Sequence, residues 1–187
     1  RLTTLTGVYE IDRPRLMREV AQFTCAFTNE LGMKDSVFVE FNLEAQGVGR
    51  VEVREAQSVI VKANPVQLPI YSLETLLAKK MKAFHDRGSG KDLYDIYQGL
   101  KLGADRRVLA EILEQVVASE ALNYVGFAQR LVGRLSDEER LRRLHASTNP
   151  YVPRALRPDW AVAGRWLKDE LAPLLVPDQS RLLQPSS

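Results

Sequence analysis

The stretch YSLETLLAKKMKAFHDRGSGKDLYDIY, residues 71–97, decides how the rest of the chain is interpreted. At about 100° per residue, a helix through its first half has one apolar stripe, formed by Leu73, Leu76, Leu77, Met81 and Phe84. Lys80 falls near the middle of this stripe. A lysine among apolar neighbours loses hydration, so its ammonium must reach solvent, find an anionic partner or give up its proton. The partner of Lys80 is therefore the first question.

The next helix carries two carboxylates that can answer it. Asp92 and Asp95 lie three residues apart and outside the apolar face of that helix, so they can share one site. Ser89 and Asp92 also fit an S-x-x-D capping box, and Asp95 can pair with Lys91 at i, i+4. Spacing alone favours the cap for Asp92. The RGSG loop nevertheless folds this helix back on the first one, so either carboxylate can be the partner of Lys80.

Periodicity leaves two interpretations of Lys80. Its stem can cover core residues while the ammonium stays at the edge of the bundle, and the helix pattern by itself favours this structural role. Alternatively, a lysine fixed on a packed helix presents a point charge to a triphosphate. Lys79 and Lys82 project away from the stripe, and we expect them to be solvated.

The segment Arg87-Gly-Ser-Gly-Lys91 resembles a phosphate-binding P-loop only poorly. His85 stands where the first glycine of G-x-x-x-x-G-K-[ST] belongs, Asp92 follows the lysine, and the preceding element is a helix rather than a strand. We reject a P-loop here. Arg87 and Lys91 can still meet a phosphate at a helix N-terminus.

The residues before this stretch predict a small α/β part. Residues 5–11 read as a strand, and Asp12 with Pro14 predicts a helix that runs to about residue 31. Alternating apolar residues predict a strand over 36–45 and a second one over 51–63, joined as an antiparallel pair. Pro65 and Pro69 then mark a boundary.

From Ser72 onward the sequence predicts only helices. Their expected ranges, besides the two already described, are 105–117, 119–134, 136–146 and 160–175, and the tail after Pro177 is expected to be frayed. The chain is therefore expected to be α+β, with a helical part about twice as long as the α/β part.

Composition excludes few functions. Lys plus Arg number 26 and Asp plus Glu 24, a net charge of +2, which by itself does not indicate a nucleic-acid binder. There is no run of about 18 apolar residues and no signal-peptide pattern at the start, so we expect a cytoplasmic protein without a membrane partner. Cys25, the single cysteine, excludes an internal disulfide and is expected to fill core space.

Two further groups of polar residues are candidates for function. Glu40 and Asn42 share the polar face of the middle strand; such a face is usually wet, but a carboxylate there can contribute to a Mg²⁺ site. Residues 130–157 collect arginines, among them Arg140, Arg142 and Arg143. This basic patch can hold an RNA backbone through its phosphates, although a solvated helix face explains it as well.

The order of residues in the opening stretch resembles that of the nucleotidyltransferase toxins of the AbiEii/AbiGii family. In these proteins a "leE-x-x-x-A-x-K-x-x-A" helix is followed by "R-x-x-x-RDlyDl". The matching residues, with Lys91 in place of the usual arginine, are Glu74, Ala78, Lys80, Ala83, Arg87, Lys91, Asp92, Tyr94 and Asp95. About 27 residues are covered directly, and the preceding strands and following helices agree with the layout of that family.

The resemblance implies a nucleotidyltransferase-like fold with a small mixed sheet packed with helices, followed by a helical bundle. Residues 1–68 would form a partial nucleotidyltransferase-like α/β region, and residues 69–187 the helical region that carries the Lys/Asp motif. The implied activity is transfer of a nucleoside monophosphate from an NTP to an RNA acceptor such as tRNA, with Mg²⁺. The implied setting is a toxin–antitoxin or abortive infection system with a cognate antitoxin.

The resemblance also implies roles for individual residues. Lys80 would bind the triphosphate, Asp92 would position the lysine or the acceptor, and Asp95 would support it. Glu40 would be the third, strand-borne carboxylate and a metal ligand. Lys82, Arg87 and Lys91 are expected to add to nucleotide binding, and Arg140, Arg142 and Arg143 to RNA binding.

One motif of the family has no counterpart in this sequence. Family members carry an earlier R-x-S/T-x-D-x-D strand whose two aspartates hold the metals, whereas here residues 1–4 resemble only its beginning and no D-x-D follows. Two carboxylates at that spacing project from one face of a strand and can chelate Mg²⁺ together with substrate phosphates. We therefore expect the printed chain to be inactive alone, either because an N-terminal segment is missing or because it is a degenerate module that binds a nucleotide, RNA or an antitoxin.

Overall fold

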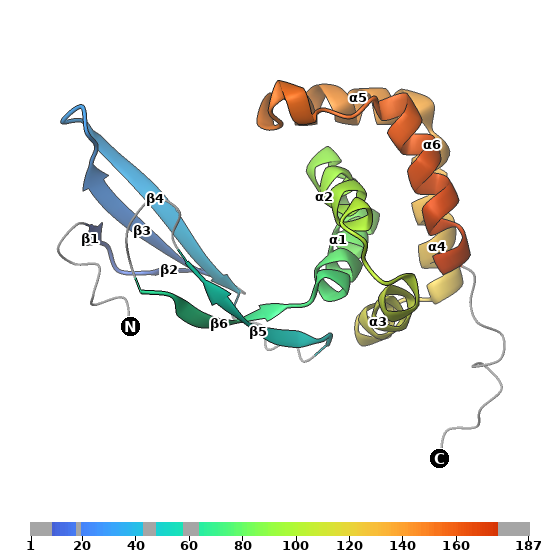
Figure 1. Ribbon diagram of the computed structural model, residues 1–187, viewed down its shortest axis with the longest axis horizontal. Helices are drawn as coiled ribbons and strands as arrows, with labels where there is room; N and C mark the ends of the chain where they lie inside the picture. Colours follow the sequence, from blue (N-terminus) through green and yellow to red (C-terminus); the bar gives the residue numbers. More distant parts are fainter. Residues whose placement is uncertain (1–8, 18–19, 43–47, 58–63, 176–187) are drawn as a thin grey trace, which may run out of the picture. The chain divides into compact units, whose positions relative to one another are not determined.

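The computed structural model describes residues 9–17, 20–42, 48–57 and 64–175. They belong to two compact units, residues 1–47 and 48–187 (Figure 1). The first unit is built from antiparallel strands, and the second joins a two-stranded sheet to the helices. The predicted α+β class is confirmed. The sequence placed the domain boundary after residue 68, whereas the two units divide after residue 47.

The first unit is a four-stranded antiparallel sheet around one long strand. Its strands are β1 (Glu10–Ile11), β2 (Arg15–Met17), β3 (Val20–Thr28) and β4 (Lys34–Asn42). β3 pairs with β4 along its whole length, with Cys25 opposite Val37, while β1 and β2 pair with β3 as well. Cys25 is buried as predicted.

The helix predicted over residues 12–31 is wrong, because this segment forms β2 and β3. Its apolar residues fit a helical stripe, but β3 also alternates, with the buried Ala21 and Cys25 on one face. The β3 segment is rich in β-branched and aromatic residues, which suit a pleated surface. Pairing with β4, the next strand along the chain, settles the choice in favour of a strand.

The predicted pairing across residues 36–63 is also wrong. β4 pairs with β3, and β5 (Val51–Ala56) pairs with β6 (Val66–Tyr71). Pro65 directly precedes β6, but Pro69 does not mark a boundary, because it lies within β6, opposite Val53. In this two-stranded sheet every strand is an edge strand, where a proline without an N–H is tolerated. Residues 5–8, 43–45 and 58–63 of the predicted strands lie outside the described residues.

The second unit contains six helices among its described residues, each near its predicted range. They are α1 (Leu73–Arg87), α2 (Gly90–Lys101), α3 (Arg106–Ser119), α4 (Tyr124–Ser136), α5 (Glu138–Thr148) and α6 (Trp160–Leu171). Short 3-10 turns follow α5 at Asn149–Tyr151 and Arg154–Leu156, and a third follows α6 at Pro173–Leu175. The tail after Pro177 lies outside the described residues.

A polar side chain begins each helix. The N-cap residues Ser72, Ser89, Asp105, Asn123, Asp137 and Asp159 all accept a hydrogen bond from a backbone N–H of the first turn. Such caps satisfy donors that have no partner within the helix. The helix starts are therefore encoded locally.

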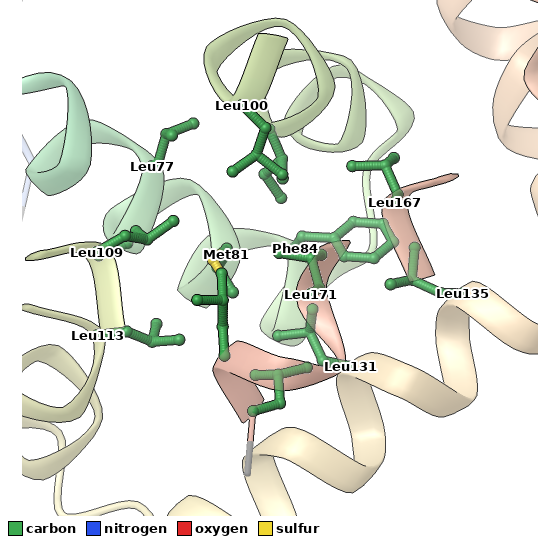
Figure 2. Packing of buried hydrophobic residues seen from close by; sticks show 14 of the residues in the cluster. Leu77, Met81, Phe84, Leu100, Leu109, Leu113, Leu131, Leu135, Leu167 and Leu171 are labelled. Atoms are coloured by element: carbon green, nitrogen blue, oxygen red, sulfur yellow. The ribbon is translucent and has the colours of Figure 1, made fainter. Parts of the chain in front are cut away.

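The core of the second unit lies between these helices. Figure 2 shows Met81 and Phe84 of α1 among leucines from α2, α3, α4 and α6. Met81 and Phe84 are fully buried. α1 is thus the central helix of the bundle. In the part of the chain that the structure describes, no helix is long and apolar enough to cross a membrane.

Candidate nucleotide-binding site

Lys80 lies at the edge of the buried side of α1, not in its middle. The buried side is turned toward Thr75 and Ala78, while Leu76 is 46% exposed. Thr75 is taken inward by the β5–β6 sheet, because its hydroxyl accepts a hydrogen bond from the Arg50 N–H and donates one to the Arg50 carbonyl. The Lys80 side chain consequently remains 39% exposed.

Both candidate carboxylates are partners of Lys80. Its Nζ lies 2.6 Å from Oδ2 of Asp95 and 3.6 Å from Oδ1 of Asp92. The Asp95 side chain is 44% exposed, whereas that of Asp92 is completely buried. The ammonium therefore sits between a solvent-accessible carboxylate and a buried one, both carried by α2.

Asp92 is held in place by the last residue of α1. Arg87 donates from Nε to Oδ2 at 2.7 Å and from Nη2 to Oδ1 at 2.6 Å, a two-pronged pair in which both carboxylate oxygens are used. Such pairs are strong and geometrically specific. The hydrogen bonds and charge of Asp92 raise the pKa of Arg87, so its guanidinium stays charged. With Lys80 and Asp95, the cluster contains two cations and two anions and is neutral as a whole.

Gly88 makes this geometry possible. It caps α1 in the left-handed conformation with φ at 61°, and Ser89 then caps α2 directly. A side chain at Gly88 would also meet the guanidinium groups of Arg134 and Arg140. The short turn brings Asp92 back to Arg87 within one turn of α2. The Ser89 side chain accepts from the Lys91 N–H and caps α2, whereas the carboxylate of Asp92 is held by Arg87 rather than completing the predicted S-x-x-D capping box.

The other lysines predicted to bind nucleotide have different surroundings. Lys91 is exposed at the start of α2, with its Nζ 3.6 Å from the centre of the Tyr151 ring, a cation–π contact. Lys82 is not simply solvated, because its Nζ lies 2.8 Å from Asp86 and 3.2 Å from Glu120. Burial lowers the pKa of Lys82, but the hydrogen bonds to these two carboxylates outweigh it and raise the pKa above 10.5. Lys82 thus ties α1 to the end of α3.

Glu40 lies in the first unit, on β4. Its Oε1 accepts a hydrogen bond of 2.6 Å from Gln22, its neighbour on β3. Within the described residues, no three His, Cys, Asp or Glu side chains are grouped so that they could hold a metal ion. Asp92 does not fit a metal either, since Arg87 occupies both of its oxygens.

The arginines of the predicted basic patch differ in how far they are exposed to solvent. Arg134 is buried, and its Nη2 donates to the Asp86 carbonyl at 3.2 Å. Burial, then the nearby charges of Arg140 and Arg130, lower its pKa. Arg140 has a buried Nε without a hydrogen-bond partner among the described residues.

Only part of the patch faces solvent. Arg142 and Arg143 are exposed, and Arg143 lies 3.9 Å from Glu139. The three arginines predicted to bind RNA therefore do not form one surface, because Arg140 is turned toward the α1–α2 turn.

The comparison with protein families agrees with this geometry. The family model described as "Nucleotidyl transferase AbiEii toxin, Type IV TA system" matches residues 9–177. Because the match spans most of the chain, the protein belongs to this family of nucleotidyltransferase toxins of type IV toxin–antitoxin systems. Neither a curated protein nor a solved structure matches the chain.

The role of Arg87 is the feature that the sequence missed. Its position before the turn suggested a phosphate ligand, whereas two of its donors hold Asp92. The signal was present as an arginine five residues before an aspartate across a glycine-containing turn. Because the Arg87 side chain is 63% exposed, its remaining nitrogen can still reach a phosphate.

Proposed function

We propose that the protein transfers a nucleoside monophosphate from an NTP to an RNA acceptor, with tRNA as the first acceptor to test. The observation that carries this proposal is the state of Lys80, which two carboxylates anchor while its side chain stays 39% exposed. An anchored and accessible cation presents a fixed charge to a triphosphate. Family membership supplies the nucleotidyl transfer and implies a cognate antitoxin as partner.

In such a transfer an acceptor hydroxyl attacks the α-phosphorus, the bond from that phosphorus to the bridging oxygen breaks, and pyrophosphate leaves. Negative charge grows on the leaving group, and the proposed task of Lys80 is to neutralise it. Asp92 is then a positioning residue, since Arg87 fixes it and it in turn holds Lys80. Asp95 is the exchangeable partner, because its exposed carboxylate can release the ammonium to an incoming phosphate.

Lys91 and Arg87 are proposed to add charge at the same edge. Lys91 is exposed at the N-terminus of α2, where the backbone also favours an anion. The corresponding proposal for Lys82 has less support, since Asp86 and Glu120 already engage its ammonium.

The family generally uses a divalent metal ion together with the NTP, and Mg²⁺ is the ion we propose. The described residues do not assemble a metal site. Glu40 remains a proposed metal ligand and strand-borne carboxylate. If it has this role, Glu40→Gln will reduce transfer by the full-length gene product while leaving nucleotide affinity unchanged.

The test of the proposal compares two neighbouring lysines. Lys80→Ala and the matched control Lys79→Ala are assayed for binding of a fluorescent ATP analogue and for transfer of labelled NTP to total tRNA by the full-length gene product. A hydrogen bond between charged groups contributes about 1.5–3 kcal/mol, so we expect Lys80→Ala to bind the analogue about 10- to 100-fold more weakly. Lys79→Ala should match the parent.

Two outcomes would change the proposal. If Lys80→Met binds and transfers like the parent, Lys80 only ties α1 to α2 and the proposal is wrong. If the parent binds nucleotide in a Lys80-dependent way but transfers no label to RNA, the protein is a binding module rather than an enzyme.

A further inference from the structure

A cleft of about 260 Å³ lies between α4, α5 and α6. Two helical stripes face each other across it, each with the i, i+3, i+4, i+7 spacing of one helix face. One runs along α5 and the other along α6 in the opposite direction, since His145 stacks on Trp160 at one end and Leu141 approaches Gly164 further along. The absence of a side chain at Gly164 keeps the two helices close at the bottom.

The bottom of the cleft is apolar and its rim is cationic. Leu135, Leu141, Trp160 and Gly164 are buried, whereas Arg142, Arg165 and Lys168 line the same cleft with exposed side chains. Within the described part of the chain, none of these three cations has a carboxylate at ion-pair distance. Glu138 is the acid in the lining, so three positive charges and one negative give the cleft a net charge of +2.

His145 adds an unpaired polar atom to the bottom of the cleft. Its ring lies 4.4 Å from that of Trp160, and its Nε2 is buried without a hydrogen-bond partner in the described residues. Burial lowers its pKa to about 4, partly opposed by Asp159, so the imidazole is neutral at pH 7. A buried polar atom without a partner is costly.

We propose that this cleft binds a single-stranded segment of the RNA acceptor, with its phosphates on Arg142, Arg165 and Lys168 and a base against the apolar bottom. The inference rests on the proposed function for the nature of the acceptor. Arg165 and Lys168 lie about one turn apart on α6 and Arg142 faces them from α5, so the charges follow the cleft instead of converging on one point. That distribution suits successive phosphates of a chain better than one isolated anion.

An acidic protein segment is the main alternative occupant, and the cleft suits it less well. A bound amphipathic helix needs a long apolar groove that accepts several anchors along its length. The cleft volume of about 260 Å³ has room for only a few side chains of such a helix. The same volume can hold one base, with the attached sugar at the edge of the cleft.

The experiment measures binding of a fluorescein-labelled single-stranded RNA of about eight nucleotides, a typical length for such sites, and of its duplex form. The test variant is R142A/R165A/K168A. The control, with the same change in net charge, is R54A/K101A/R107A, which removes three exposed cations outside the cleft lining. A second readout uses Trp166→Phe, which leaves Trp160 as the sole tryptophan, so that RNA bound in the cleft alters its fluorescence.

We expect the cleft variant to bind single-stranded RNA at least tenfold more weakly, and the control less than threefold. Each phosphate contact contributes about 0.7 to the slope of log affinity against log salt for single strands, so the cleft variant should lose about 2 from that slope. The fluorescence change of Trp160 should disappear with it. Equal losses in both variants, or duplex binding as tight as single-stranded binding, would overturn the inference.

The same variants separate this inference from the proposed function. If label transfer to RNA depends on Lys80 but the cleft variant binds RNA like the control, the cleft is wrong and the function stands. If RNA binding maps to the cleft but no label is transferred, the cleft stands and the function is wrong. Binding of a glutamate-rich peptide to the cleft in place of RNA would overturn the assignment of the occupant.

Discussion

Removing Arg87 should lower the free energy of unfolding more than neutralising its partner Asp92. Asp92 is completely buried, whereas Arg87 is 63% exposed. In Arg87→Met the carboxylate loses both of its hydrogen bonds and keeps only Lys80, at 3.6 Å. Removing one partner of a buried pair costs about 3–5 kcal/mol, because the other charge stays buried and unpaired. Asp92→Asn instead leaves two cations that water can reach, and should cost about 1.5–3 kcal/mol for the lost charge-assisted hydrogen bonds.

The double variant distinguishes this explanation from a general loss of packing. Once Asp92 is an asparagine, Arg87 no longer neutralises a buried charge, so Arg87→Met/Asp92→Asn should be about as stable as Asp92→Asn alone. The free energy of unfolding is measured by urea titration with tryptophan fluorescence, since both tryptophans lie on α6 in the helical unit. Additive losses, or an Arg87→Met variant no less stable than Asp92→Asn, would refute the reasoning.

Four smaller changes test other parts of the helical unit. Gly90→Ala should lower the free energy of unfolding by about 2 kcal/mol, because the added Cβ would lie 2.6 Å from the Leu144 carbonyl oxygen. Gly133→Ala should raise it by about 0.5–1 kcal/mol in the same urea assay, because a Cβ there meets nothing within 4 Å and alanine has the higher helix propensity. The pKa of His145 lies near 4, below its ordinary 6.5, because the residue is buried; the unfolded chain therefore binds the proton first, and stability should fall as pH drops from about 6.5 toward 4. His145→Phe should make the urea midpoint less sensitive between pH 7.5 and 5.0, and an unchanged pH dependence would contradict this. Ala121 has φ at 53°, a left-handed conformation that costs an alanine about 1 kcal/mol. Ala121→Gly removes this strain but gives the unfolded chain more conformational entropy, so the thermal midpoint should rise only slightly.

The helical unit was predictable because its signals are local. Amphipathic periodicity located the helices, and polar residues such as Asp105, Asn123 and Asp137 stand where the N-caps were found. These features depend on residues within a few positions of one another. Sequence reasoning therefore placed these elements to within a few residues.

The sheets were not predictable in the same way. Residues 20–28 carry an apolar pattern that suits a helix or a strand, and pairing with β4 decides between them. Pro69 looked like a boundary because the sequence does not tell that its strand has a neighbour on one side only. Such choices depend on which strands pair, and the pattern within one segment does not state this.

The sequence predicted which residues form the candidate site, but not all of the contacts between them. The order of residues identified Lys80, Asp92 and Asp95 as neighbours, and the ion pairs bear this out. Periodicity placed Lys80 in the middle of a buried stripe, which was wrong because Thr75 turns inward to the β5–β6 sheet. The α5–α6 cleft could not be foreseen, since its cations come from two helices whose packing the sequence does not state.

The turn between α1 and α2 has a fixed length for a chemical reason. Surface turns usually accept inserted residues, but this one closes the ring from Arg87 to Asp92. If α2 kept its place, one residue added or removed between them would rotate the side chains of α2 by about 100° around the helix axis. Asp92 would then point away from Arg87, and Asp95 would point away from Lys80. The spacing of five residues between the arginine and the aspartate is therefore required for their contact. Relatives that keep both residues should also keep this spacing in the sequence.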